Sequence, residues 1–219
     1  MTTLNRAQAG PPLLAPALAF AVLTIASAAL GATGTRPDTS ATDTAAYLAA
    51  HQGVVRLLSF AVFGASVPLV VWAATVYRRQ RRLGVHAPGA MIGLAGGVLS
   101  AAALATSGLV TWVSVQSSDT PGLARALTSL AFASGGPGFV VPLALLIAGL
   151  AVPALFRKLL PRWLCIAGLA IAAAAVLASF SLLSPALYPL IPVGRFGGLV
   201  WLIVASVLLP RDRRAARTD

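Results

Sequence analysis

Few side chains in this sequence can bind or transform a charged molecule. Arg56, Arg125 and Arg195 each stand near one end of a long apolar stretch, and His51 precedes the first of them. Guanidinium groups bind carboxylates and phosphates through charge-assisted hydrogen bonds. If the arginines converge with His51, they form a small cationic pocket for an anion or a lipid headgroup. Otherwise each arginine extends to the headgroup layer or pairs with a nearby carboxylate such as Asp43.

Catalytic and redox chemistry find little support in the residue types. His51 with Asp43 and Tyr47 is the one arrangement that resembles an acid–base site, and we assign no catalytic residue from it. His86 is expected on the other side of the membrane from His51, so the two histidines cannot ligate one haem. Cys165 is the only cysteine. We expect neither a cofactor nor a metal site.

The glycine-rich run SGGPG, Ser134 to Gly138, has three interpretations. A phosphate-binding loop would need GxxxxGK followed by Ser or Thr, and no Lys is near. A selectivity filter would need polar surroundings or fourfold repetition. A straight helix over residues 122–156 would be about 52 Å long, well beyond a bilayer core of about 30 Å. The run therefore predicts a break that joins a short helix to a membrane span.

The apolar stretches must position these residues. The chain has 219 residues, of which 58% are hydrophobic and 10% charged. An apolar run of about 20 residues spans the hydrocarbon core as a helix, because backbone groups in lipid must bond within the segment. We predict an all-α polytopic transmembrane helix bundle, one domain over residues 1–210 with a basic tail at 211–219. Its six spans are predicted at 13–33, 54–77, 89–113, 137–156, 163–183 and 194–209.

The net charge of +11 comes from clusters that flank these spans. In a six-span arrangement most basic residues fall on the side of the two termini, which the positive-inside rule makes cytoplasmic. We expect the clusters to attract anionic lipid headgroups, and we expect no nucleic-acid partner because no basic module stands apart from the membrane. The clusters are Arg78, Arg79, Arg81 and Arg82; Arg157, Lys158 and Arg162; and Arg211, Arg213, Arg214 and Arg217.

The first span also resembles a signal peptide, since Ala26-Ser27-Ala28 mimics a cleavage site. Its apolar region is longer than signal peptides usually have, so we expect it to be retained.

The third span carries Gly93, Gly97, Ala101 and Ala105 at a spacing of four. Small residues at this spacing let helices approach closely, and we favour packing within the monomer over a dimer seam.

Two short helices are predicted on the side opposite the termini. The first carries Tyr47 and His51, begins with Thr42 or Asp43 as its cap, and ends at Gly53. The second covers about 121–134, begins with Pro121 at its first position, and is expected to lie at the membrane interface. No Asp, Glu, Asn, Gln or Lys falls within a predicted span, so we expect no transport site at the bilayer midplane.

Five blocks resemble a family of bacterial integral membrane proteins of unknown function: HQGVVRLLSF, RRLGVHAPG, LTSLAFASGGPGFVVPLALLIAGLAVPALF, LLPRWL and GRFGGLVWLIVASVLLP. The resemblance implies a six-span protein of the bacterial inner (plasma) membrane. It carries over no ligand or catalytic residues.

Three functions remain open at this stage. We favour a non-enzymatic accessory or regulatory membrane protein that acts through lipids or a membrane-protein partner. The second is a transporter of a small solute, anion or lipid that captures its substrate at the three arginines. The third is a membrane-embedded lipid-modifying enzyme, for which His51 and Asp43 would be needed.

Overall fold

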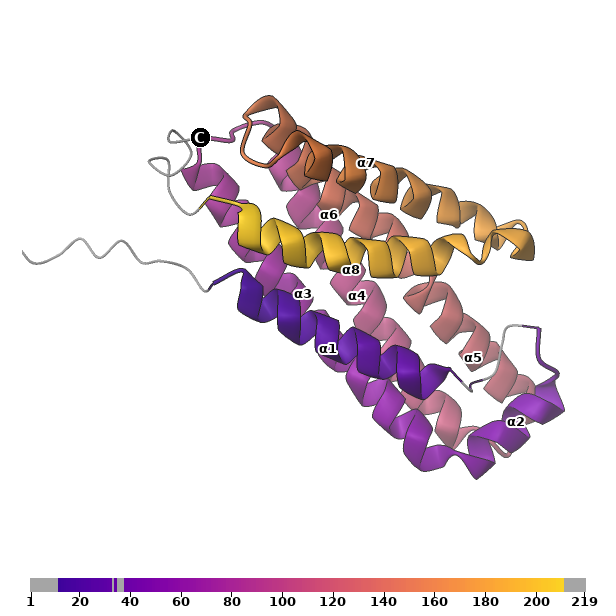
Figure 1. Ribbon diagram of the computed structural model, residues 1–219. Helices are drawn as coiled ribbons and strands as arrows, with labels where there is room; N and C mark the ends of the chain where they lie inside the picture. The colour runs from indigo at the N-terminus through magenta and orange to yellow at the C-terminus, as the bar shows by residue number, and fades with distance from the viewer. Residues whose placement is uncertain (1–11, 33, 35–37, 211–219) are drawn as a thin grey trace, which may run out of the picture.

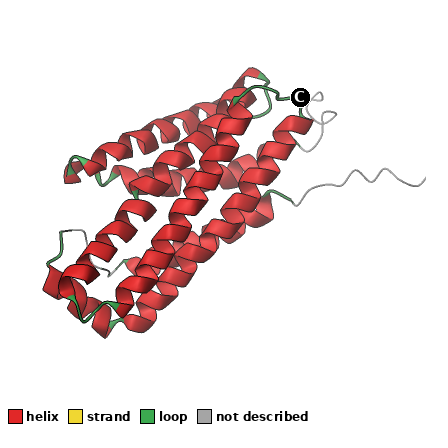
Figure 2. Ribbon diagram, turned by 180° about the vertical axis from the view of Figure 1, so that it is seen from behind, coloured by secondary structure: helices red, strands yellow, loops and turns green. Residues whose placement is uncertain are grey.

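The computed structural model describes residues 12–32, 34 and 38–210, and over these residues the secondary structure is entirely helical (Figures 1 and 2). The predicted all-α class is confirmed. In chain order the elements are α1 (Leu14–Gly31), α2 (Ala41–Ala50), α3 (Gln52–Arg82), α4 (Gly89–Gln116), α5 (Pro121–Gly135), α6 (Pro137–Phe156), α7 (Arg162–Leu177), the 3-10 turns η1 (Ala178–Leu182) and η2 (Pro185–Leu187), and α8 (Leu190–Leu208).

Six segments of the described chain are long and apolar enough to cross a bilayer, which indicates a multi-pass membrane protein. They are α1, α3, α4, α5 joined to α6, α7 joined to η1, and η2 joined to α8. The first and last described residues lie at the same end of the bundle, as six crossings require (Figure 1). The cytoplasmic placement of this end, and the bacterial membrane itself, stay predictions.

The longest helices extend past what a bilayer core needs. At 1.5 Å per residue, the 31 residues of α3 reach about 46 Å. Together with α2, α5 and the adjoining end of α4, α3 forms the end of the bundle opposite the chain termini, here called the α2 end (Figure 1). At the other end, Arg79 Nη1 donates to the carbonyl oxygen of Leu209 at 3.4 Å, which ties the last turn of α3 to the end of α8.

The two predicted short helices are present as α2 and α5. Pro121 opens α5 after the N-cap Thr120, as predicted. The predicted cap of α2 was wrong, because Ser40 is the residue with extended backbone and its hydroxyl accepts the Asp43 N–H at 3.1 Å. Gly53 does not end α2 either: His51 caps it, and α3 starts at the next residue.

The helix break predicted at SGGPG lies at Gly136, between α5 and α6. Pro137 has no N–H, and the carbonyl of Gly136 accepts from both Phe139 and Val140. On the N-terminal side of the break, α5 packs along α4 and runs in much the same direction as α6 (Figures 1 and 2). A location of α5 at the membrane interface stays a prediction.

The predicted small-residue face of α4 packs against helices of the same chain. A Cβ on Gly149 of α6 would lie 2.5 Å from the Cα of Gly93, so the α4 and α6 backbones are in contact. A Cβ on Gly97 would meet Ala73 of α3 on another side. These contacts supply the close dispersion interactions that hold helices together in lipid.

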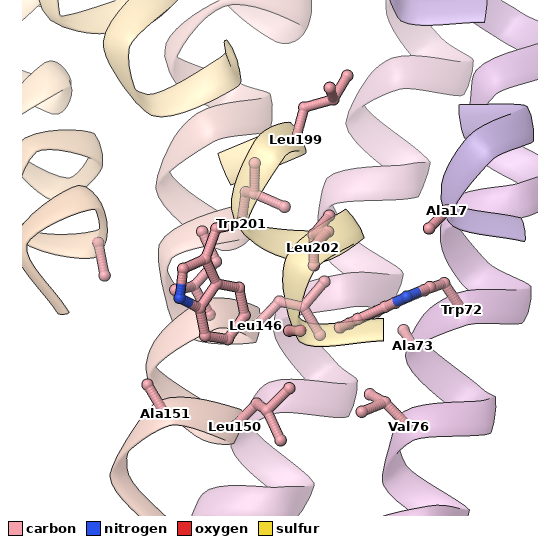
Figure 3. Packing of buried hydrophobic residues seen from close by; sticks show 14 of the residues in the cluster. Ala17, Trp72, Ala73, Val76, Leu146, Leu150, Ala151, Leu199, Trp201 and Leu202 are labelled. Carbon is pink, nitrogen blue, oxygen red and sulfur yellow. The ribbon is translucent and has the colours of Figure 1, made fainter. Parts of the chain in front are cut away.

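Two buried tryptophans hold α8 in the bundle (Figure 3). The indole N–H of Trp72 in α3 donates to Ser206 Oγ at 2.7 Å. The indole N–H of Trp201 donates to the carbonyl of Leu164 in α7 at 2.8 Å. Each ring fills the apolar core while its only polar atom finds an acceptor, which is what burial of an indole requires.

Candidate anion-binding cavity

A cavity of about 250 Å³ lies toward the α2 end, between α1, α2, α3, α4, α5 and the first turns of α6 and α8. This volume is just below the usual range for pockets that enclose small organic ligands. Most of the lining is apolar, and among the described residues Arg195 is the one that carries a charge. Seven hydroxyl side chains complete the polar part: Thr24, Ser27, Tyr47, Ser107, Thr111, Ser114 and Thr128.

Arg195 lies deeper in the last span than the sequence predicted. We expected this span to begin at residue 194, with Arg195 at its end. The apolar helical stretch instead runs from Pro185 to Leu208, because η2 and the first turn of α8 precede the arginine. Prolines in the YPLIP segment occupy the N-cap and first turn of α8, where a missing N–H costs little. The segment therefore continues the span.

The guanidinium of Arg195 has protein contacts on two sides. Its Nη2 donates to the carbonyl oxygen of Gly135, and its Cζ lies 5.3 Å from the centroid of the Phe139 ring. The buried Nε has no hydrogen-bond partner among the described residues. Within the same part of the chain no carboxylate pairs with Arg195. The side chain is thus a partly buried cation without a counter-charge.

The helix break provides the acceptor for Arg195. In an uninterrupted helix the carbonyl of Gly135 would bond the N–H of Phe139, but that N–H donates to Gly136 instead. Gly135 also permits close approach, because a Cβ there would overlap Ser107 Oγ. Both Gly135 and Gly136 line the cavity. The SGGPG segment therefore contributes a carbonyl oxygen that no helical N–H uses and that Arg195 bonds instead.

The hydroxyl groups around the cavity use their hydrogens elsewhere. Ser107 donates to the carbonyl of Ala131 at 2.8 Å, and Thr111 donates to the carbonyl of Ser107 at 2.8 Å. Thr128 donates within α5, to Ala124 at 2.9 Å. Ser27 and Ser114 make similar bonds to backbone carbonyls. A hydroxyl has one hydrogen and two lone pairs, so each of these oxygens remains an acceptor.

The other predicted site residues do not line the cavity. Arg56, Arg125, His51 and Asp43 are exposed, and none of them belongs to its lining. Ten residues of α5 separate Arg125 from Gly135, about 15 Å along the helix. The cavity thus contains Arg195 without the other two arginines.

His51 and Asp43 take part in local contacts of α2. The His51 ring stacks on Tyr47 at 4.4 Å between centroids, and its Nδ1 lies 3.0 Å from the Tyr47 carbonyl. The Asp43 carboxylate accepts from the Ser40 hydroxyl at 2.6 Å. Of the residues in these α2 contacts, Tyr47 is the one that lines the cavity.

Sequence reasoning missed the hydroxyl groups of the site. Ser107, Thr111 and Ser114 follow one another at intervals of four and three, which places them on one face of α4. That spacing was a signal for a polar stripe inside the bundle.

Comparison with known proteins gives no match to a protein-family model, to a curated protein or to a solved structure. The function is therefore argued from the cavity and its residues.

Proposed function

We propose that this protein is a non-enzymatic membrane protein that binds an anionic group in the cavity at the α2 end. The observation that carries the proposal is Arg195: it lines the cavity, lies inside an apolar span and has no carboxylate partner in the described chain. An ionisable residue in such a position is expensive and usually functional. A bound carboxylate or phosphate would supply the missing counter-charge.

The donor geometry of Arg195 supports this assignment. A guanidinium has five N–H donors, and the Gly135 carbonyl takes one from Nη2. Nε is buried and has no protein partner among the described residues, so a ligand in the cavity would use the remaining hydrogens on Nη1 and Nη2. A carboxylate or phosphate can bond two guanidinium N–H groups at once, and such paired charged bonds are stronger than neutral ones. Placing an arginine at the centre of a span costs about 2.5–3.5 kcal/mol, which ligand binding would offset.

An accessory or regulatory role fits this site better than catalysis. Besides Arg195, the polar side chains of the described lining are seven hydroxyls, of which five donate to backbone carbonyls, and a hydroxyl nucleophile would need an adjacent base. His51 and Asp43, the residues considered for an enzyme, are exposed and outside the lining. We therefore propose binding without chemical conversion.

Transport of the anion is the second candidate, favoured by one observation. The broken helix α5–α6 lines the cavity with Gly135 and Gly136, and transporters commonly form substrate sites from such discontinuous helices. Passage would require a route past the buried core beneath the cavity, where Leu146 and Leu150 pack (Figure 3). Uptake of radiolabelled phosphate into vesicles containing the purified protein distinguishes a carrier from a binding protein.

The proposal is tested by anion binding to the purified, detergent-solubilised protein. Phosphate should raise the thermal unfolding midpoint relative to chloride at equal ionic strength, because a ligand stabilises the state that binds it. Arg195→Gln should abolish this shift. Arg125→Gln removes an exposed arginine outside the cavity and serves as the matched control, with the shift retained. An undiminished shift in Arg195→Gln would overturn the proposal.

A further inference from the structure

We infer that the anion bound in this cavity is a phosphate ester whose organic part carries hydroxyl or ammonium donors, as in the polar end of a membrane lipid or its soluble counterpart. The inference rests on the proposed function and names the ligand class of the same site. It follows from the way the cavity separates its donors from its acceptors.

The charged donors are concentrated at one place. Among the described residues Arg195 is the charged group of the lining, and apart from the buried Nε and the bond to Gly135 its Nη1 and Nη2 hydrogens remain for a ligand. The phosphate belongs here, where a guanidinium and an oxyanion can form paired charged hydrogen bonds. The Phe139 ring lies 5.3 Å from the guanidinium carbon and covers one side of it, so the ligand approaches from the cavity side.

The acceptors lie on the neighbouring helices. Thr111 and Thr128 face the same cavity from α4 and α5, and both have committed their hydrogens to backbone carbonyls, at 2.8 Å and 2.9 Å. Their oxygens can only accept. A simple anion such as inorganic phosphate or acetate would bring more oxygen acceptors to these oxygens, with few or no hydrogens to offer. A ligand with O–H or N–H⁺ groups next to its phosphate would satisfy them.

The two parts of the site are close together. Ser107 Oγ and Arg195 Nη2 both lie within 4.0 Å of the point that a Cβ on Gly135 would occupy. Ser107 is itself an acceptor-only hydroxyl, because it donates to the Ala131 carbonyl at 2.8 Å. The ligand's donor group must therefore be separated from its phosphate by only a few bonds.

The volume of the cavity limits the ligand to a polar head. Its volume of about 250 Å³ is below the roughly 300–1,000 Å³ of pockets that enclose drug-sized ligands. A phosphate with a short polyol or aminoalkyl substituent fills this space. An acyl chain attached to it would have to lie outside.

The test compares phosphate esters that differ in their donors. Calorimetry on the full-length protein in detergent should show glycerol 3-phosphate and phosphoethanolamine binding at least about tenfold more tightly than methyl phosphate, which has the same anionic group without the donors. Thr111→Val and Thr128→Val should each weaken glycerol 3-phosphate about fivefold and leave methyl phosphate unchanged. Thr111→Ser keeps the acceptor oxygen and should bind glycerol 3-phosphate like the unaltered protein.

Thr75→Val is the matched control. Thr75 donates to the Val71 carbonyl at 2.7 Å in the same way, but it lies outside the cavity, so its loss should not change binding.

Phosphatidylglycerol in mixed micelles identifies the source of the ligand. Competition with glycerol 3-phosphate supports a lipid headgroup, and no competition supports a soluble ester.

Two failures are distinguishable. If methyl phosphate binds as tightly as glycerol 3-phosphate and Arg195→Gln abolishes both, the anion site stands and the donor-bearing ligand is wrong. If both threonine-to-valine variants bind glycerol 3-phosphate like the unaltered protein, the anion site again stands and the donor-bearing ligand is wrong. If no ester binds, or if binding survives in Arg195→Gln, the proposed function falls and the inference falls with it.

Discussion

The side-chain amide of Gln80 donates a hydrogen bond of 3.1 Å to the carbonyl oxygen of Gly149. Four residues after Gly149 stands Pro153, which has no N–H to bond that carbonyl within α6. Arg195 gives the same kind of support to Gly135, next to the break before Pro137. Side chains from α3 and α8 thus replace backbone hydrogen bonds that the interrupted α5–α6 segment lacks, as a helix in lipid requires.

The first prediction concerns Gln80, whose side chain is only 2% exposed. Gln80→Leu should lower the free energy of unfolding by about 1–3 kcal/mol, because it leaves the Gly149 carbonyl without a partner in an apolar environment. Pro153→Ala supplies a backbone N–H for that carbonyl. In the Pro153→Ala background the Gln80→Leu change should therefore cost less. Equal costs in both backgrounds, measured by denaturant unfolding in detergent, would show that Gln80 contributes through packing alone.

The second prediction concerns the pair of Trp72 and Ser206. Ser206 Oγ accepts from the indole at 2.7 Å and donates to the Leu202 carbonyl at 2.6 Å. Ser206→Ala should destabilise the protein by about 1–3 kcal/mol, since the buried indole N–H loses its acceptor. With Trp72→Phe already present, the same serine change should have almost no effect, because no donor remains.

A matched control for this pair is Ser117→Ala. Ser117 is outside the core and donates to the Val113 carbonyl at 3.3 Å, so its loss should change the unfolding free energy by less than about 0.5 kcal/mol. A penalty for Ser206→Ala that persists in the Trp72→Phe background would assign the effect to the bond with Leu202.

The sequence predicted the helices well because lipid leaves the backbone little choice. A run of about 20 apolar residues must satisfy its N–H and C=O groups internally, so the six spans follow from composition. The break at Gly136 followed from length, since one helix from Gly122 to Phe156 would overshoot the bilayer.

The site was harder to predict because it depends on the depth and rotation of each helix. Arg195 was placed at the end of its span, which was predicted to begin at residue 194, whereas the prolines before it begin the helix. The three arginines were grouped because each follows a loop at the same end. Only the packing of α8 against α5 and α6 selects Arg195 for the cavity. Gln80 lay three residues past the predicted end of its span at 77, so no polar contact with α6 was expected from it.

The third prediction concerns the contact between α4 and α6. A Cβ on Gly149 would lie 2.5 Å from the Gly93 backbone, with no flexible side chain to move away. Gly149→Ala should therefore lower stability by about 1–3 kcal/mol or more, since the helices must separate. Gly53→Ala is the control: nothing lies within 4 Å of a Cβ there, and removing a helical glycine should be neutral or slightly stabilising. Equal thermal midpoints for Gly149→Ala and the unaltered protein would contradict the close helix contact.

The last prediction concerns orientation, which the positive-inside rule sets through the basic clusters beside the chain ends. In a background of Cys165→Ala, single cysteines are introduced by Asp119→Cys in the α4–α5 loop and His86→Cys in the α3–α4 loop, both at exposed positions. A maleimide that cannot cross the membrane should label Asp119→Cys in intact bacterial cells and should label His86→Cys only after the cells are permeabilised. The opposite labelling pattern would place the α2 end and its cavity on the cytoplasmic side. Labelling of both cysteine variants in intact cells would contradict a bundle that spans the membrane between the α3–α4 and α4–α5 loops.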